Sequence, residues 1–181
     1  MRPTKKKGSK AVAKPLPIEV NYAEFTSIMK STLSMHHKIA FLLAWGSGLR
    51  ISEVINLKQA DFNFEEKTIR VNMGKNSKDR IVPMAPHFEK EHLKHIPIPC
   101  KQRSLQKAFK LYAEKSGVLA RKPRVHFHSL RHGFATHCLR SGINLIDIQG
   151  HLGHEDVSTT AIYTNVAPVE RINNFQEKFR P

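Results

Sequence analysis

The chain reads His128-Ser129-Leu130-Arg131-His132 and then His151-Leu152-Gly153-His154 near its carboxyl end, and Tyr163 follows nine residues later. Arginine recognises phosphate oxygens with a planar fork of donors. Imidazole moves protons near neutral pH, and tyrosine is one of the few side chains that form covalent enzyme intermediates. This combination of residue types predicts chemistry on a phosphodiester that requires neither a metal nor a cofactor.

The charge of the whole chain points to a polyanionic partner. Its 181 residues include 30 Lys and Arg against 15 Asp and Glu, which gives a formal net charge of +15. A chain this basic gains affinity for nucleic acid because each neutralised phosphate releases counterions. The alternative is a basic protein that is merely kept in solution by its charge.

Nothing in the sequence indicates secretion or a membrane. The start of the chain is basic and has no apolar run behind it. The longest apolar run, from Ile39 to Trp45, is far too short to span a bilayer. We therefore expect an intracellular protein, in the cytoplasm and associated with the nucleoid.

Helical signals occupy both ends of the chain. Asn21 and Glu24 form a capping-box pattern that predicts a helix through about Ser31. An apolar run predicts a buried helix from about Met35 to Gly46, and Ile51 to Leu57 reads as a short helix. Further helices are predicted at the following ranges: one containing Leu105, Ala108, Phe109, Tyr112 and Ala113 on a single face, then about 128–140, 144–150 and 169–179.

The middle of the chain changes to the period of a strand. Short segments at 60–64, 68–73 and 80–84 predict an antiparallel sheet of three strands, with a polar hairpin loop at 74–79. The predicted fold class is therefore α+β, mainly helical with a small sheet. Residues 1–17 are basic and contain three prolines, which predicts a flexible arm before a single domain over 18–181.

Five motifs in this order resemble the tyrosine recombinases, the family of phage integrases and Xer-like enzymes. They are Gly48-Leu49-Arg50-Ile51-Ser52-Glu53, Gly74-Lys75, the segment 128–132, Leu152-Gly153-His154, and Tyr163. The resemblance covers roughly 21–179, the catalytic domain of that family. Most members carry an additional helical domain at the amino end, whereas only the basic arm precedes the domain here.

The resemblance implies a role for each of six catalytic residues. Tyr163 would be the nucleophile, which leaves a 3′-phosphotyrosyl bond and a free 5′ hydroxyl. Arg50 and Arg131 would hold the non-bridging oxygens, and Lys75 would protonate the departing 5′ oxygen. Two histidines complete the set, since His128 would act as base or acid at the tyrosine and His154 would donate to a phosphate oxygen.

Other residues are assigned supporting roles, and simpler readings stay open. Glu53 would orient the cluster. Contacts with the DNA backbone are expected from Lys5, Lys6, Lys7, Lys78, Arg80 and His132. Arg50 could instead cap a helix, Tyr163 could be a packed aromatic, and Lys78 competes with Lys75 for the role of acid. His128 and His132 lie at metal-ligand spacing, but the intervening Arg131 disfavours a cation.

The predicted function is a site-specific recombinase or integrase that cleaves and rejoins double-stranded DNA, working as a homo-oligomer, a tetramer on paired sites. Two alternatives remain: relaxation of DNA in the manner of a type IB topoisomerase, and a non-catalytic DNA-binding module. The final predicted helix, with Ile172 and Phe175, could pack on its own core, whereas the resemblance implies that it docks onto a neighbouring protomer; both readings stay open.

Overall fold

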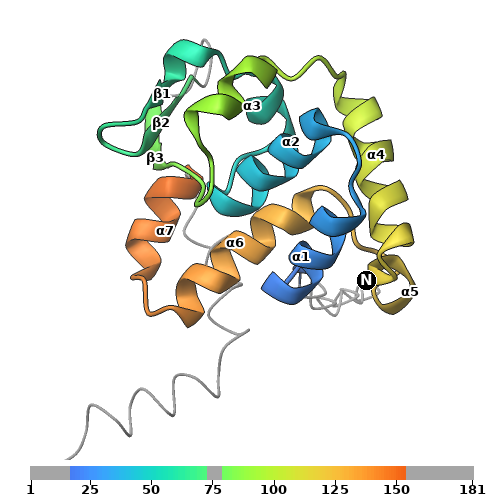
Figure 1. The fold of residues 1–181 in the computed structure, drawn as a ribbon. Helices are drawn as coiled ribbons and strands as arrows, with labels where there is room; N and C mark the ends of the chain where they lie inside the picture. Colours follow the sequence, from blue (N-terminus) through green and yellow to red (C-terminus); the bar gives the residue numbers. More distant parts are fainter. Residues whose placement is uncertain (1–16, 73–78, 154–181) are drawn as a thin grey trace, which may run out of the picture.

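The computed structural model describes residues 17–72 and 79–153 (Figure 1). Seven α-helices, two 3₁₀ helices and three strands lie within these ranges. In chain order they are α1 (Tyr22–Ser31), α2 (Met35–Gly46), α3 (Ile51–Asn56), η1 (Gln59–Asp61), β1 (Phe62–Asn63), β2 (Thr68–Val71), β3 (Arg80–Pro83), η2 (Lys90–His95), α4 (Gln102–Lys115), α5 (Val118–Arg121), α6 (His128–Arg140) and α7 (Leu145–Leu152). The predicted mainly helical α+β fold with three strands is confirmed.

Helix α2 forms the centre of the molecule. Every residue from Ile39 to Gly46 is buried, as expected for a helix that is apolar on all sides. Figure 1 shows α2 and α6 crossing in the middle, with α1 and α4 around them. The five apolar positions predicted for one face of α4 are all buried.

The sheet has the order β1-β2-β3, with both pairs antiparallel. Ile69 on β2 pairs with Val82 on β3, and both are buried. Val71 pairs with Arg80 at the other end of the same two strands. Helix α7 packs against β3, so the start of this strand faces the end of that helix.

Two hydrogen bonds hold the segment before α1, one to α6 and one to α2. The Val20 backbone N–H donates to the Ser129 carbonyl at 3.0 Å, and the Trp45 indole donates to the Val20 carbonyl at 2.9 Å. A Cβ added at Gly133 would lie 2.1 Å from the Val20 oxygen. Only glycine permits this approach of α6, the helix that begins with the motif 128–132.

The predicted capping box is present, since the Glu24 N–H donates to Asn21 and the Asn21 N–H donates to Glu24. The predicted arm 1–17, apart from Pro17, and the predicted helix 169–179 lie outside the described residues. In the described part of the chain, no helix combines the length and the apolar character needed to cross a membrane.

Candidate active site

The turn between α2 and α3 presents Arg50. Gly48 has a positive φ of 67°, and a Cβ there would lie 2.5 Å from the Phe134 ring. Glycine is therefore required both by the backbone conformation and by the space. The turn leaves Arg50 at the N-cap of α3 with its side chain one third exposed.

Glu53 lies in the first turn of α3, and its carboxylate interacts with three arginines. Its Oε2 accepts the Arg50 backbone N–H at 2.7 Å, and its Oε1 accepts from Arg50 Nη1 at 2.9 Å. Arg80 donates to both oxygens, at 2.9 and 3.0 Å, as a planar fork. Arg131 Nη1 lies 3.8 Å from Oε2. Glu53 therefore connects the three arginines; its role in orienting a catalytic cluster stays a prediction.

Burial and charge act in opposite directions on Glu53. Burial is the largest influence and raises its pKa, because a carboxylate loses hydration inside the protein. The hydrogen bonds from Arg80 and from the Arg50 backbone, with the charges of Arg80 and Arg131, outweigh burial and lower the pKa to about 2. Glu53 is consequently ionised at any pH at which the protein would work.

The last turn of α7 receives one arginine at each of three successive carbonyl groups. Arg80 Nε donates to the His151 oxygen at 2.8 Å, Arg131 Nη2 donates to the Leu152 oxygen, and Arg50 Nη2 donates to the Gly153 oxygen at 3.3 Å. Carbonyl groups at a helix end have no partner within the helix and carry the negative end of its dipole. Three cations bound there stabilise both the helix end and the arrangement of the arginines.

Arg131 is the most enclosed of these arginines, with 1% of its surface exposed. Its Nη1 donates to the Gly48 carbonyl at 2.7 Å. It thus joins α6 to the turn before α3 and to the end of α7. Residues far apart in the sequence converge here, as the resemblance implied for Arg50 and Arg131.

His128 opens α6 beside this cluster. Partial burial of its ring is the largest influence on its pKa, and the nearby charges of Arg131, His126 and Arg50 act in the same direction. Although the residue is exposed at the surface, its pKa lies well below the ordinary 6.5. The imidazole is therefore neutral at pH 7 and able to accept a proton. His132 lies edge-on to it, with ring centroids 4.7 Å apart.

The structure differs from expectation in the surroundings of Arg80, which was assigned to contact with DNA. Its side chain is 10% exposed and is bound to Glu53 and His151. No signal in the sequence indicated this, because Ile81 and Val82 are both apolar and the segment therefore does not alternate. The structure places Arg80 on the same face of β3 as the buried Val82, whereas Ile81 is exposed.

Several predicted residues cannot be placed in this cluster. Lys75, Lys78, His154, Tyr163 and the lysines 5–7 lie outside the described residues. Their roles stay predictions. Across 17–72 and 79–153, no group of three or more His, Cys, Asp or Glu side chains could hold a metal ion.

The described residues can bind an oxyanion. Arg50 is partly exposed, His128 is neutral and accessible, and three guanidinium groups surround a single carboxylate. This excess of positive charge in a partly enclosed site is an arrangement that stabilises negative charge on a reacting phosphate.

The chain is similar to known tyrosine recombinases over most of its length. The tyrosine recombinase XerA of Thermococcus onnurineus (strain NA1) is 36% identical over 190 residues, which cover 93% of this chain and 65% of XerA. This chain therefore spans slightly less than two thirds of that relative.

Two solved structures share the fold. A XerH site-specific recombinase bound to palindromic difH substrate, in a post-cleavage complex, matches with a TM-score of 0.75 and 25% identity over 93% of this chain and 56% of XerH. The catalytic domain of bacteriophage HP1 integrase matches with a TM-score of 0.66 and 20% identity, over 90% of this chain and 95% of that domain. The model of the phage integrase family matches residues 18–97 and 93–170. The chain belongs to the phage integrase family, the tyrosine recombinases.

Proposed function

We propose that this protein is a site-specific recombinase or integrase that cuts and rejoins double-stranded DNA through Tyr163. The convergence of Arg50 and Arg131 on Glu53, beside a neutral His128, is the observation that supports it most directly. With DNA as its substrate, the protein works in the cytoplasm, at the nucleoid.

In the proposed reaction the Tyr163 phenol oxygen attacks the scissile phosphorus and its proton passes to His128. Arg50, with His154, binds the non-bridging oxygens, on which negative charge increases. The resemblance assigns Arg131 to the same oxygens; because Arg131 is 1% exposed and donates to the Gly48 and Leu152 carbonyls, its contact with the phosphate requires one of these bonds to be exchanged. The bond from phosphorus to the 5′ oxygen breaks, and Lys75 supplies the proton to that oxygen. The 3′-phosphotyrosyl bond retains the energy of the phosphodiester, so a 5′ hydroxyl rejoins the strand without a further energy source.

A nicked suicide DNA substrate tests this proposal. Cleavage releases a short fragment, so the protein stays bound to DNA as an adduct that migrates slowly on a denaturing gel. We expect the adduct with the native chain and none with Tyr163→Phe. Absence of the adduct across a random library of DNA sequences would contradict the proposal. Relaxation of plasmid by a monomer, without exchange between paired sites, would instead identify a topoisomerase-like activity.

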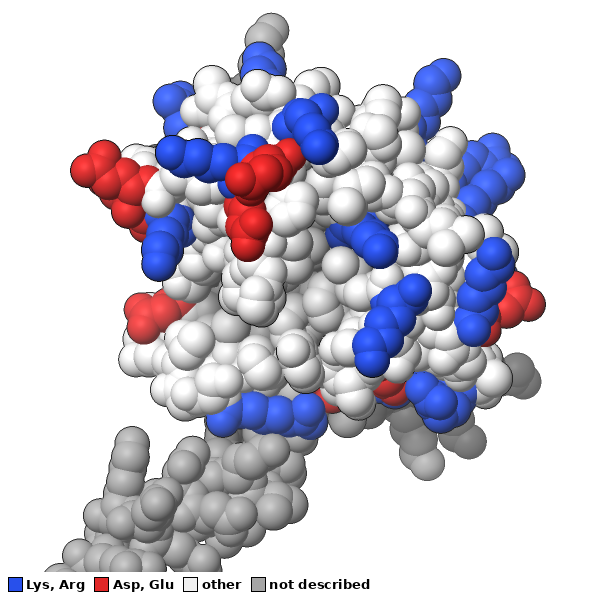
Figure 2. All heavy atoms as spheres, in the orientation of Figure 1, with Lys and Arg blue, Asp and Glu red and all other residues white. Residues whose placement is uncertain are grey.

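Binding of DNA should also depend steeply on salt. Basic side chains are dispersed over the face drawn in Figure 2, which shows separate Lys and Arg side chains and few acidic ones. Each phosphate contact contributes about −0.9 to the slope of log K against log salt. Affinity measured from 50 to 300 mM salt should therefore fall by orders of magnitude, and an affinity insensitive to salt would contradict a basic DNA-binding face.

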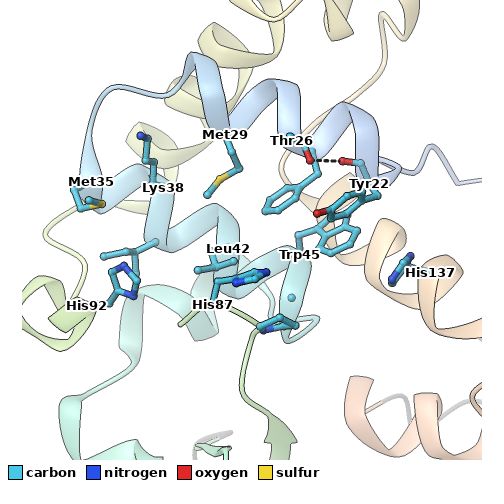
Figure 3. Close-up of a pocket in the computed structure, with 14 residues that line it drawn as sticks. Tyr22, Thr26, Met29, Met35, Lys38, Leu42, Trp45, His87, His92 and His137 are labelled. Atoms are coloured by element: carbon cyan, nitrogen blue, oxygen red, sulfur yellow. Dashed lines mark hydrogen bonds between the residues drawn. The ribbon is translucent and has the colours of Figure 1, made fainter. Parts of the chain in front are cut away.

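We further propose that the protein assembles as a homotetramer on paired DNA sites. Between α1 and α2 lies an apolar hollow of about 560 Å³. Figure 3 shows side chains of both helices turned towards it, with His87 and His92 on one side and His137 at one end. The proposed occupant is the segment 169–179 of a second copy, whose Ile172 and Phe175 are spaced as on one face of a helix.

A further inference from the structure

The Arg80 side chain contacts Glu53, His151 and Gly153, all of which are residues of the protein interior or of the end of α7. It donates two bonds to the Glu53 carboxylate and one to the His151 carbonyl. Gly153 packs on the same side chain, since a Cβ there would lie 3.1 Å from Arg80 Cδ. Arg80 therefore joins the start of β3 to α3 and to the last turn of α7.

A second arginine shows what an outward-facing position on this sheet looks like. Arg70 lies on β2, its side chain is 66% exposed, and it pairs with the exposed Asp79 at 3.1 Å. Arg80 lies on the next strand with 10% exposed. The two arginines are matched in type and in sheet but differ in the direction of the side chain.

The charge of Glu53 explains what Arg80 contributes. One carboxylate beside Arg50 and Arg131 alone would neutralise a large part of the positive charge offered to a phosphate. Because Arg80 takes both carboxylate oxygens, the carboxylate is shared among three cations and the described cluster keeps an excess of two positive charges. The fork also fixes the plane of the carboxylate that binds Arg50.

We propose that Arg80 is a positioning residue for the reaction: it holds Glu53 so that Arg50 is oriented and electropositive towards the scissile phosphate, and it does not itself bind DNA. This inference rests on the proposed function. It assigns Arg80 a role through Glu53 in place of the contact with DNA expected from the sequence.

The test separates binding of DNA from cleavage in the variant Arg80→Gln. We expect its dissociation constant to stay within about threefold of the native value, with an unchanged salt slope. The rate of adduct formation at saturating DNA should fall on the order of a hundredfold, as when one group that stabilises charge in the transition state is lost. Weaker binding with a shallower salt slope and an unchanged rate would overturn the proposal.

Three comparisons exclude a general loss of structure. Arg70→Gln should leave the rate unchanged, and Arg80→Lys, which keeps the charge but loses the fork, should give an intermediate rate. On DNA whose scissile phosphate carries a neutral methyl group, the Arg80→Gln defect should shrink to about tenfold, because less negative charge must be stabilised. An equal defect on both DNAs would mean that Arg80 acts only on the fold and would overturn the proposal.

A measurement without any reaction separates this proposal from the proposed function. The ¹⁵N relaxation of Arg50 Nε in the protein without DNA should report greater motion in Arg80→Gln than in the native chain. Identical motion would overturn the positioning role even if the native chain forms the adduct. Increased motion supports that role even if no adduct forms, an outcome that would contradict the proposed function alone.

Discussion

At Glu53 the chain places one buried carboxylate among three guanidinium groups, 2.9 Å from Arg50, 2.9 Å from Arg80 and 3.8 Å from Arg131. Isolated carboxylates are strongly disfavoured inside proteins, and so are unpaired guanidinium groups. The carboxylate is stabilised here by the guanidinium groups, and these are stabilised by the carboxylate and by the carbonyl groups of α7. Loss of the Glu53 charge should consequently lower the free energy of unfolding more than loss of a peripheral ion pair.

The variant Glu53→Gln keeps the shape of the side chain and removes its charge. We expect unfolding to become easier by about 3 kcal/mol, because three cations then repel one another without a counter-charge. Glu24→Gln is the matched control, since Glu24 is equally buried but binds the single cation Lys122 at 2.8 Å. Its expected loss is about 1 kcal/mol. Urea unfolding measures both, and equal losses would contradict the central place of Glu53.

Acid should lower the free energy of unfolding of the native chain by protonating Glu53. The pKa of Glu53 is lowered from 4.5 to about 2, so its contribution is fully present above pH 4.5 and disappears as the pH falls towards 2. A shift of this size corresponds to about 3 kcal/mol. Urea unfolding at pH 6, 4 and 3 should show the difference between the native chain and Glu53→Gln shrinking with pH. A constant difference would contradict the low pKa.

At the scale of elements, the end of α7 is where three separate parts of the fold meet. Successive carbonyls of its last turn bind arginines from β3, α6 and the N-cap of α3. Gly153 ends the helix with a φ of 61°, the left-handed conformation that favours glycine at this position. The position of this helix end therefore depends on strand and helices alike.

Two glycines allow this dependence to be measured. Gly142 and Gly153 both have positive φ, so replacement by Ala strains the backbone by about 1 kcal/mol at either position. Only at Gly153 would the added Cβ meet a neighbour, Arg80, while at Gly142 nothing lies within 4 Å. Gly153→Ala should therefore lose about 1 kcal/mol more and should slow adduct formation, whereas Gly142→Ala should not. If Gly142→Ala and Gly153→Ala changed the free energy of unfolding and the rate equally, the proposed dependence of the site on the end of α7 would be contradicted.

The sequence predicted those elements whose signals are local. The Asn21 cap, the apolar run of α2 and the alternation in β2 each depend on a few neighbouring residues, and each prediction agrees with the structure. Helices α5 and η2 were missed because four and six residues are too short for a helical period to show.

The site was harder to predict because the charge of a residue does not tell whether its side chain points into the protein or towards solvent. Arg80 and Arg70 have the same charge, and only the pairing of β3 with β2 and the packing of α7 distinguish them. The motif residues Arg50, Glu53, His128 and Arg131 were found through resemblance. The contacts of Arg50 and Arg131 with carbonyl groups at the end of α7 had no signal in the sequence.

At the scale of the whole molecule, the apolar hollow between α1 and α2 and the arginine cluster have no residue in common, although α6 contributes His137 to the hollow and Arg131 to the cluster. Tyr22 and Met35 line it and are 61% and 45% exposed. Separate surfaces permit assembly and cleavage to be changed independently.

A charge placed in the hollow tests the proposed assembly. Met35→Glu should reduce higher-order complexes on DNA with paired sites at least tenfold, because a carboxylate cannot be buried unpaired against Ile172 or Phe175. Leu111→Glu is the matched control, since Leu111 is 46% exposed on α4 and does not line the hollow. Complexes are counted by gel shift together with the affinity for a single site. Loss of single-site affinity in Met35→Glu alone, with assembly retained, would contradict the proposal.

The close approach of α6 at Gly133 has a consequence for engineering. Any side chain there would displace the helix that carries His128 and Arg131, because the Val20 oxygen and the Trp45 indole already occupy the space. Libraries made for directed evolution should therefore hold position 133 constant. Deep mutational scanning should find Gly133 nearly intolerant of change, even under selection for folding alone.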